Sequence, residues 1–214
     1  MNQTNIIITG VGGQGIITAG LVIGNAITTS GLKAVMSEIH GMSQRGGGVI
    51  VELRIGDVHG PIIPRGAADL IIGFEALETL RVLNRGSAGT TVIMNDQRIT
   101  PVSVSVGDAE YPDIQLAISK LRAGGGKLYL IDGRRLAAQA GNRLSSNVVL
   151  VGAAYAAGFI PVDFPALQES VKSMFQEKSW GTNLRALELG IERFLLLRGK
   201  FEEKPTRSVP SLSN

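Results

Sequence analysis

Near its N-terminus the chain carries an apolar run that leads directly into a glycine-rich turn. The run is Ile6 to Ile8, the turn is Gly10-Val-Gly-Gly-Gln-Gly15, and a helical stretch begins at Ile16. A strand, a glycine turn and a helix start in this order expose unpaired backbone N–H groups, and the missing Cβ atoms let an anion approach closely. We therefore predict a phosphate-binding cradle. The spacing also matches the dinucleotide-binding fingerprint, which is weak evidence on its own.

The composition favours one well-packed domain and argues against nucleic acid as a partner. The chain has 214 residues, of which 44% are hydrophobic and 18% charged. Its net charge is only +3, its basic residues are scattered, and aromatic residues make up 5%. A nucleic-acid surface usually needs a basic stripe or stacking aromatics.

Cysteine is absent, which excludes disulfides, iron–sulfur ligation by this chain and a thiol nucleophile. The absence also fits a reducing compartment, and we expect a cytoplasmic protein. No apolar stretch reaches the roughly 18 residues that a membrane span needs, so no membrane association is predicted.

Strand and helix patterns alternate through the first two thirds of the chain, which predicts a mostly parallel sheet with helices on its faces. The fold class that we expect is α/β, a single Rossmann-like sheet that is atypical after its second strand and is followed by a helical C-terminal third. We expect one domain over residues 1–200 and a flexible tail over 201–214. The expected strands are Asn5–Thr9, Ala34–Glu38, Val49–Ile55, Asp69–Phe74, Thr90–Asn95, a short edge strand Val102–Val106, and Leu128–Asp132.

The segment after the second strand departs from a nicotinamide-binding fold. Glu38 stands where such a fold places its ribose-binding acid. Only ten residues, four of them glycine, separate Glu38 from Val49. A parallel crossover needs about a dozen residues and usually a helix. We therefore expect the strand that starts at Val49 to run antiparallel or to lie in a local hairpin-like layer.

This short segment contains Ser43, Gln44, Arg45 and Gly46, which place a hydroxyl, an amide and a guanidinium beside flexible backbone. Arginine suits a planar, bidentate grip on phosphate or carboxylate. Two interpretations stay open. Arg45 either pairs with a surface acid such as Glu38, or it joins the glycine cradle in holding an anion.

The sequence contains no evident catalytic constellation and no metal site. His40 and His59 are the only histidines, and they do not have a metal-ligand spacing. We therefore assign no catalytic residue and no metal ligand. A binding apparatus without catalytic groups indicates either a ligand-binding module or one subunit of a larger enzyme.

Four motifs together resemble the gamma-type subunit of 2-oxoacid:ferredoxin oxidoreductases. The segment His40-Gly-Met-Ser-Gln-Arg-Gly-Gly47 is most similar to the beta subunit of the indolepyruvate enzymes. The resemblance continues at Asn142 and Asn147 and weakens after Val162. The motifs are Gly10–Gly15, Glu38–Gly47, Gly60–Pro64 and Ala68–Glu78.

This resemblance implies an enzyme complex that oxidatively decarboxylates 2-oxoacids to acyl-coenzyme A and CO2 with reduction of ferredoxin. The 2-oxoacids that it implies are indolepyruvate and related aryl pyruvates. Thiamine diphosphate, Mg and 4Fe–4S clusters are then expected on a large alpha subunit, and coenzyme A is a substrate that this chain contacts. The residues that match the family motifs, and that we expect to face coenzyme A or the partner, are Gly12, Gly13, Gln14, Gly15, Ser43, Gln44, Arg45 and Gly46.

Two alternatives remain at this point. A self-contained NAD(P)-binding oxidoreductase would use the same fingerprint, although the missing crossover argues against it. A stand-alone nucleotide or acyl-coenzyme A binding module would need no large partner.

Overall fold

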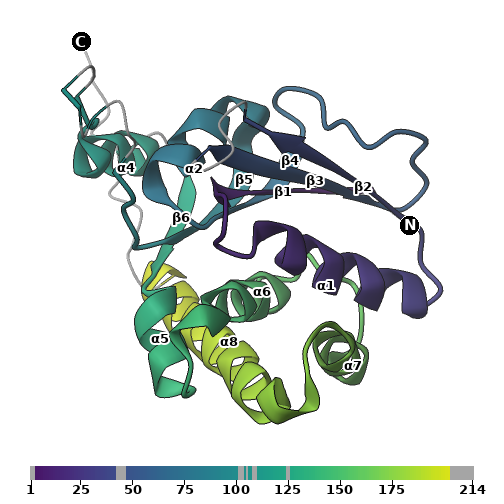
Figure 1. The fold of residues 1–214 in the computed structure, drawn as a ribbon. Helices are drawn as coiled ribbons and strands as arrows, with labels where there is room; N and C mark the ends of the chain where they lie inside the picture. Colours follow the sequence, from purple (N-terminus) through teal and green to yellow (C-terminus); the bar gives the residue numbers. More distant parts are fainter. Residues whose placement is uncertain are drawn as a thin grey trace.

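The chain is built around one six-stranded sheet, with strand order β2-β3-β1-β4-β5-β6 (Figure 1). A computed structural model describes residues 3–41, 47–100, 104, 106–107, 110–123 and 126–202. The strands are β1 Thr4–Val11, β2 Ala34–His40, β3 Gly48–Ile55, β4 Ala68–Gly73, β5 Gly86–Asn95 and β6 Lys127–Ile131.

Strand β3 is the antiparallel member of this sheet. It pairs antiparallel with β2 on one side and with β1 on the other, whereas β1, β4, β5 and β6 run parallel to one another. The antiparallel direction predicted for the strand after Val49 is therefore confirmed. A hairpin strand occupies the position beside β1 that a second parallel strand would take in a nicotinamide-binding half-domain.

Helices cover both faces of the sheet. α1, α5, α6, α7 and α8 lie on one face, and α2 and α4 lie on the other (Figure 1). The helices are α1 Ile16–Thr29, α2 Ala76–Val82, α4 Ile114–Ala123, α5 Gly133–Gln139, α6 Ser146–Ala156, α7 Phe164–Met174 and α8 Trp180–Glu202, with short 3₁₀ turns η1 Leu83–Arg85, η2 Arg143–Ser145 and η3 Glu177–Ser179. After β6 the described chain is helical, as the sequence predicts.

The two faces of the sheet bury separate cores, and the period of two along each strand divides the side chains between them. Ile6 and Ile8 of β1 join the larger core under α1, α6 and α8, whereas Ile7 joins the smaller core under α2 and α4. All three isoleucines are fully buried. Continuous apolar strands of this kind are typical of parallel sheets covered on both sides.

The connections out of β1 and β4 leave the sheet in opposite directions. The chain passes from β1 through α1 on one face, and from β4 through α2 on the other face (Figure 1). Open α/β sheets bind their ligands outside the carboxyl ends of strands at such a switch point. The glycine turn after β1 lies at this edge.

The expected elements agree with the observed ones to within a few residues, with one exception. The short edge strand expected over Val102–Val106 is not found, because Val104 is helical and Val106 lies in a turn, and residues 101–103 and 105 lie outside the described residues. Residues 203–214 of the expected tail also lie outside them, and the domain boundary after residue 200 stays a prediction. Among the described helices, none is long and apolar enough to cross a membrane.

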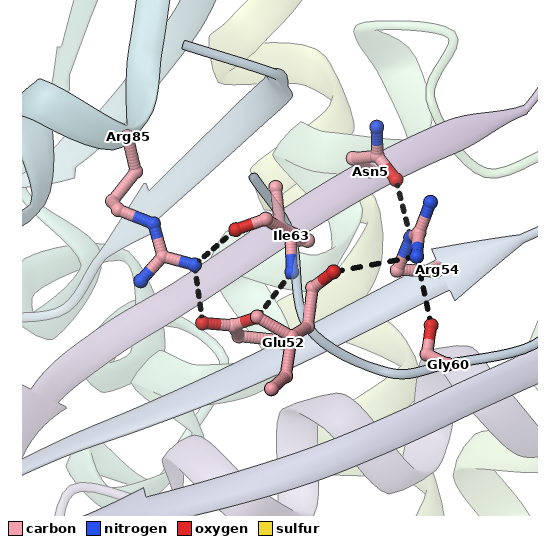
Figure 2. Close-up of polar contacts among 7 residues, drawn as sticks. Asn5, Glu52, Arg54, Gly60, Ile63 and Arg85 are labelled. Carbon is pink, nitrogen blue, oxygen red and sulfur yellow. Dashed lines mark hydrogen bonds and ion pairs between the residues drawn. The ribbon is translucent and has the colours of Figure 1, made fainter. Parts of the chain in front are cut away.

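A buried polar cluster fixes the connection between β3 and β4 (Figure 2). Glu52 of β3 is fully buried, and its carboxylate accepts hydrogen bonds from Arg85 Nη2 at 2.6 Å and from the backbone N–H of Ile63 at 2.5 Å. Arg85 also donates to the carbonyl of Ile63, and Arg54 Nη1 donates to the carbonyl of Gly60 at 2.8 Å. We call these five residues the Glu52 cluster. It ties an irregular loop to the sheet through hydrogen bonds of the Glu52, Arg54 and Arg85 side chains.

Candidate functional site

The glycine turn after β1 has the geometry of an anion cradle. Gly13 and Gly15 have φ angles of 93° and 80°, which are conformations that glycine adopts without strain. Gly15 is the N-cap of α1, and no side chain caps this helix. No acidic residue lies in the first turn of α1 either. The turn therefore presents a helix start whose free N–H groups and positive dipole end favour an anion.

The side chain of Gln14 holds the turn in shape. Its Oε1 accepts a hydrogen bond from the backbone N–H of Val11 at 2.7 Å. Its Nε2 donates to the carbonyl of Phe74, at the end of β4, at 3.1 Å, and to Gln97 Oε1 at 3.3 Å. Both ends of the amide are thus engaged within the protein. The predicted ligand role of Gln14 stays a prediction, and the geometry assigns it the fixing of the cradle between β1, β4 and the segment after β5.

The structure brings the cradle next to the second predicted motif. The N–H of Gly12 donates to the carbonyl of Gly47 at 3.1 Å, and the N–H of Gly41 donates to the carbonyl of Gly48 at 2.8 Å. Gly41 and Gly47 flank the predicted residues Ser43, Gln44, Arg45 and Gly46, which themselves lie outside the described residues. The role predicted for that loop is untested.

A cleft opens beside the cradle, on the face of the sheet that carries α1, α5 and α6. Its volume is about 200 Å³. The described residues that line this cleft, which we call the cradle pocket, are Gly13, Gln14, Gln97, Arg134, Arg143, Leu144 and Ser146. Gly13, Gln97 and Arg134 follow the carboxyl ends of β1, β5 and β6. Three strands and the start of α6 therefore contribute to one pocket.

The pocket is cationic. Arg134 and Arg143 are exposed, and neither forms an ion pair with any residue that the structure describes. The adjacent Arg135, by contrast, pairs with Asp132 at 3.6 Å. No acidic side chain is among the described lining residues. Two arginines beside a free helix start are suited to phosphate or carboxylate groups.

Sequence reasoning did not select Arg134, Arg143 or Ser146. Arg134 could have been found, because it comes three residues after the strand Lys127–Ile131 ends and parallel strands present their carboxyl ends at the same edge. Arg143 and Ser146 carry no such signal. Their place depends on how α6 packs against the start of α1, which sequence periodicity does not encode.

Two buried carboxyl groups follow β4 on the opposite face. Glu75 caps α2 by accepting from the N–H of Glu78 at 2.9 Å, and it also accepts from the hydroxyl of Tyr111 at 2.8 Å. Both acids therefore lie at the start of α2, where a carboxylate caps free N–H groups and favours the helix dipole. Burial, chiefly, and then the hydrogen bond and charge of Glu75 raise the pKa of Tyr111.

Glu78 lies closer to the cradle side. Its carboxylate lies beside the backbone of Gly48, and a Cβ added to Gly48 would clash with Glu78 Oε2. The pKa of Glu78 is raised, mainly by burial and further by the charge of Glu75, while Arg81 acts in the opposite direction. The described residues that line the cradle pocket include no acid, so they can bind and orient an anion but offer no evident proton-transfer group.

The described residues contain no group of three His, Cys, Asp or Glu side chains that could hold a metal ion. His40 ends β2 and lies 3.3 Å from the carboxylate of Glu38, on the surface. Because the chain has no cysteine, it cannot supply thiolate ligands to an iron–sulfur cluster.

Residues 5–193 match the family described as pyruvate ferredoxin/flavodoxin oxidoreductase. The chain belongs to this family. The matched range includes the cradle and all described residues of the cradle pocket.

Curated relatives support the same membership. The indolepyruvate oxidoreductase subunit IorB of Thermococcus kodakarensis is 41% identical over 194 residues, which cover 90% of this chain and 96% of the relative. The corresponding subunit of Archaeoglobus fulgidus is 39% identical over 188 residues, covering 88% of this chain and 94% of the relative. Both relatives are thus matched over nearly their whole length.

Solved structures share the fold at lower identity. A 2-oxoglutarate:ferredoxin oxidoreductase from Magnetococcus marinus, with 2-oxoglutarate, coenzyme A and succinyl-CoA bound, has a TM-score of 0.70 at 20% identity. The match covers 92% of this chain but 32% of that chain, so the fold found here forms one part of a longer polypeptide there.

Proposed function

We propose that this chain is the small subunit of an indolepyruvate-type 2-oxoacid:ferredoxin oxidoreductase. The observation that carries the proposal is the match over nearly the full length of subunits named for indolepyruvate oxidoreductase, at about 40% identity. In the reaction, an aryl pyruvate loses its carboxyl group as CO2, its acyl group is transferred to the thiol of coenzyme A, and two electrons pass to ferredoxin.

The contribution of this chain is to hold coenzyme A by its diphosphate. The cradle and the arginines of the cradle pocket supply free N–H donors and positive charge without an opposing acid. The pocket volume of about 200 Å³ is below the roughly 300–1,000 Å³ of complete small-molecule sites. It therefore accommodates a phosphate-sized part of the ligand, and the remainder lies against a partner.

That partner is a large alpha subunit which carries thiamine diphosphate, Mg and the 4Fe–4S clusters. Bound thiamine diphosphate supplies the decarboxylation chemistry, and the clusters conduct electrons. The small chain has neither thiolate ligands nor a described metal-binding group, so its own part is binding and orientation. We place the complex in the cytoplasm, in keeping with the absence of cysteine.

The loop Ser43–Gly46 is part of the same proposal. Gly47, the residue that follows this loop, accepts a hydrogen bond from the N–H of Gly12 in the cradle. Replacing Arg45 by Ala in the assembled enzyme is expected to raise the KM for coenzyme A about tenfold, because a charge-assisted contact is lost. The KM for the 2-oxoacid serves as the internal control. An unchanged KM for coenzyme A excludes Arg45 from the site.

The decisive experiment for the function is anaerobic co-expression with a candidate large subunit. The purified complex is assayed with indolepyruvate, phenylpyruvate, pyruvate and 2-oxoglutarate, following ferredoxin reduction. We expect iron–sulfur absorbance in the complex and highest kcat/KM with the aryl pyruvates. Preference for pyruvate or 2-oxoglutarate would contradict the substrate assignment, and failure to co-purify with any large subunit would contradict the subunit assignment.

A further inference from the structure

The outward face of α8 is charged in its first half. Arg185 forms ion pairs with Glu188 at 3.0 Å and with Glu192 at 3.1 Å, and all three side chains are exposed. Such charged side chains are typical of the face that a helix presents to water. The opposite face of α8 is buried against α6, where a Cβ added to Gly190 would clash with the carbonyl of Val149. This half of α8 therefore has the pattern of an ordinary surface helix.

The second half of the same outward face is apolar. Leu195 and Leu196 are 43% and 62% exposed, and a Cβ added to Gly199 would lie in open space. Residues spaced by three and four lie on one face of a helix, so Glu192, Leu195, Leu196, Gly199 and Lys200 form a single stripe. We call it the α8 stripe. Its five residues are also the described residues that line a surface hollow of about 690 Å³.

The fold of the chain does not use the α8 stripe. Phe194, on the opposite side of the helix, is 2% exposed, and its ring centroid lies 4.6 Å from that of Tyr129 in β6. Figure 1 shows this end of α8, drawn in yellow, beside β6. The core thus contacts the side of α8 that faces away from the stripe. A contiguous apolar strip with charges at its rim is typical of a surface that contacts another molecule.

The charges at the two ends of the α8 stripe have opposite signs. Glu192 lies at its start and Lys200 at its end, about 12 Å apart along the helix, and Leu196 lies midway between them. Lys200 forms no ion pair with any residue that the structure describes, and Arg185 bonds only Oε1 of the Glu192 carboxylate. A stripe with this order is complementary to its own reversed copy. In an antiparallel pair, each Glu192 lies opposite Lys200 of the other copy.

We propose that the α8 stripe is a contact between two copies of this chain. The two α8 helices lie antiparallel about a twofold axis at Leu196, and Gly199 leaves room for a leucine of the second copy. The contact is isologous, because the same residues serve both copies. The stripe is only about two turns long, so we expect it to bury less than the roughly 800 Å² per partner of a stable interface. The expected Kd is on the order of 10 μM.

The test places one cysteine at the twofold axis. Leu196→Cys is introduced into the full-length chain, which has no cysteine of its own. A disulfide needs Cβ atoms about 4 Å apart, so close approach at the axis favours it. After oxidation at protein concentrations above the expected Kd, we expect most of the chain to run at twice its 22.6 kDa on a non-reducing gel. Absence of this covalent pair would overturn the proposal.

Glu188→Cys is the matched control. Glu188 lies on the same outward face, and its side chain is 43% exposed. It is eight residues from Leu196, so the proposed pairing separates the two copies of this position by about 24 Å. We expect little covalent pair from this variant. Equal yields from both variants would overturn the proposal, because random collision would then explain the disulfide.

Charge exchange tests the antiparallel register. In the Leu196→Cys chain, Glu192→Lys should lower the yield of covalent pair about threefold at low salt, since it brings like charges together. Adding Lys200→Glu should restore the yield. Arg185 cannot cause this recovery, because Glu192→Lys removes its partner in both variants. Failure of the first change to lower the yield, or of the second to restore it, would overturn the antiparallel contact.

Repeating the oxidation in the complex with the large subunit distinguishes the other occupants. The covalent pair of small chains should persist. A disulfide from position 196 to the large subunit, or loss of the pair on assembly, would assign the α8 stripe to the large subunit and overturn the proposal. Removing residues 203–214 should leave the yield unchanged; a severalfold rise would assign the stripe to the chain's own C-terminal segment. The proposal does not depend on the proposed function, because the full-length chain alone gives the first result.

Discussion

The Glu52 cluster and the cradle pocket are both polar regions on one sheet, and they differ in how their donors are used. In the Glu52 cluster the buried carboxylate has two donors, and Arg85 reaches both that carboxylate and a loop carbonyl (Figure 2). In the cradle pocket, α1 has no side-chain cap, and two arginines have no described acid.

This difference separates groups that stabilise the fold from groups that are available to a ligand. A buried charge that loses its partner is costly, so the buried pair of Glu52 and Arg85 is expected to respond to mutation with lost stability. Donors that are already unpaired have no such internal bond to lose. Their mutation is expected to change affinity for coenzyme A and to leave the fold largely intact.

The largest expected effect is in the Glu52 cluster. Glu52→Ala leaves the guanidinium of Arg85, whose side chain is 19% exposed, without its carboxylate. We expect a loss of about 3 kcal/mol in the free energy of unfolding, measured by urea denaturation. The KM for coenzyme A in the assembled enzyme should not change.

The surface ion pair between Lys33 and Asp57, with side chains 53% and 88% exposed, provides the control. Asp57→Ala should cost less than about 1 kcal/mol. If Glu52→Ala costs no more than this control, the assignment of the Glu52 cluster to stability is wrong.

The next effect is at Gly15. An alanine at position 15 would have to adopt a φ of 80°, and its Cβ would lie 2.7 Å from Asn147 Nδ2. An alanine at position 13 would have to adopt a φ of 93°, but its Cβ would lie in open space. Backbone strain of this kind costs about 1–3 kcal/mol. We expect both variants to lose stability, but only Gly15→Ala to displace Asn147. Gly15→Ala should therefore raise the KM for coenzyme A more than Gly13→Ala does, and equal values would argue against a site between α1 and α6.

The smallest effect concerns Glu78 and depends on pH. Its raised pKa means that the folded chain binds this proton more readily than the unfolded chain does. The stability that Glu78 contributes is thus present below its ordinary pKa and is lost as the pH rises through the raised value. Glu78→Gln should raise the melting temperature by a few degrees at pH 7.5 and hardly at all at pH 4. A uniform change at both pH values would show that burial of the charge is not the cause.

The fold could largely be read from the sequence, whereas the site could be read only in part. The Ile6–Ile8 run, the glycine turn and the short link to Val49 predict the strand, the cradle and the antiparallel β3, because each depends on local geometry. The same logic places Arg134 after a strand end. Arg143 and Asn147 reach the cradle only through the packing of α6 against α1, and their neighbours in sequence give no sign of it.

Gln14 shows the opposite limitation. Its place in the motif suggests a ligand contact, but the structure engages both ends of its amide with Val11, Phe74 and Gln97. The hydrogen bonds of the folded chain distinguish a residue that shapes a cradle from one that lines it with free donors.

Hydrogen exchange of the assembled enzyme tests the central claim most directly. Peptides that cover residues 12–18 and 143–150 are compared with the peptide covering 56–67 in the Glu52 cluster, with and without saturating coenzyme A. We expect slower exchange at the starts of α1 and α6 when coenzyme A is present, and no change in the 56–67 peptide. Unchanged exchange at both helix starts, in an enzyme that turns over coenzyme A, would contradict it.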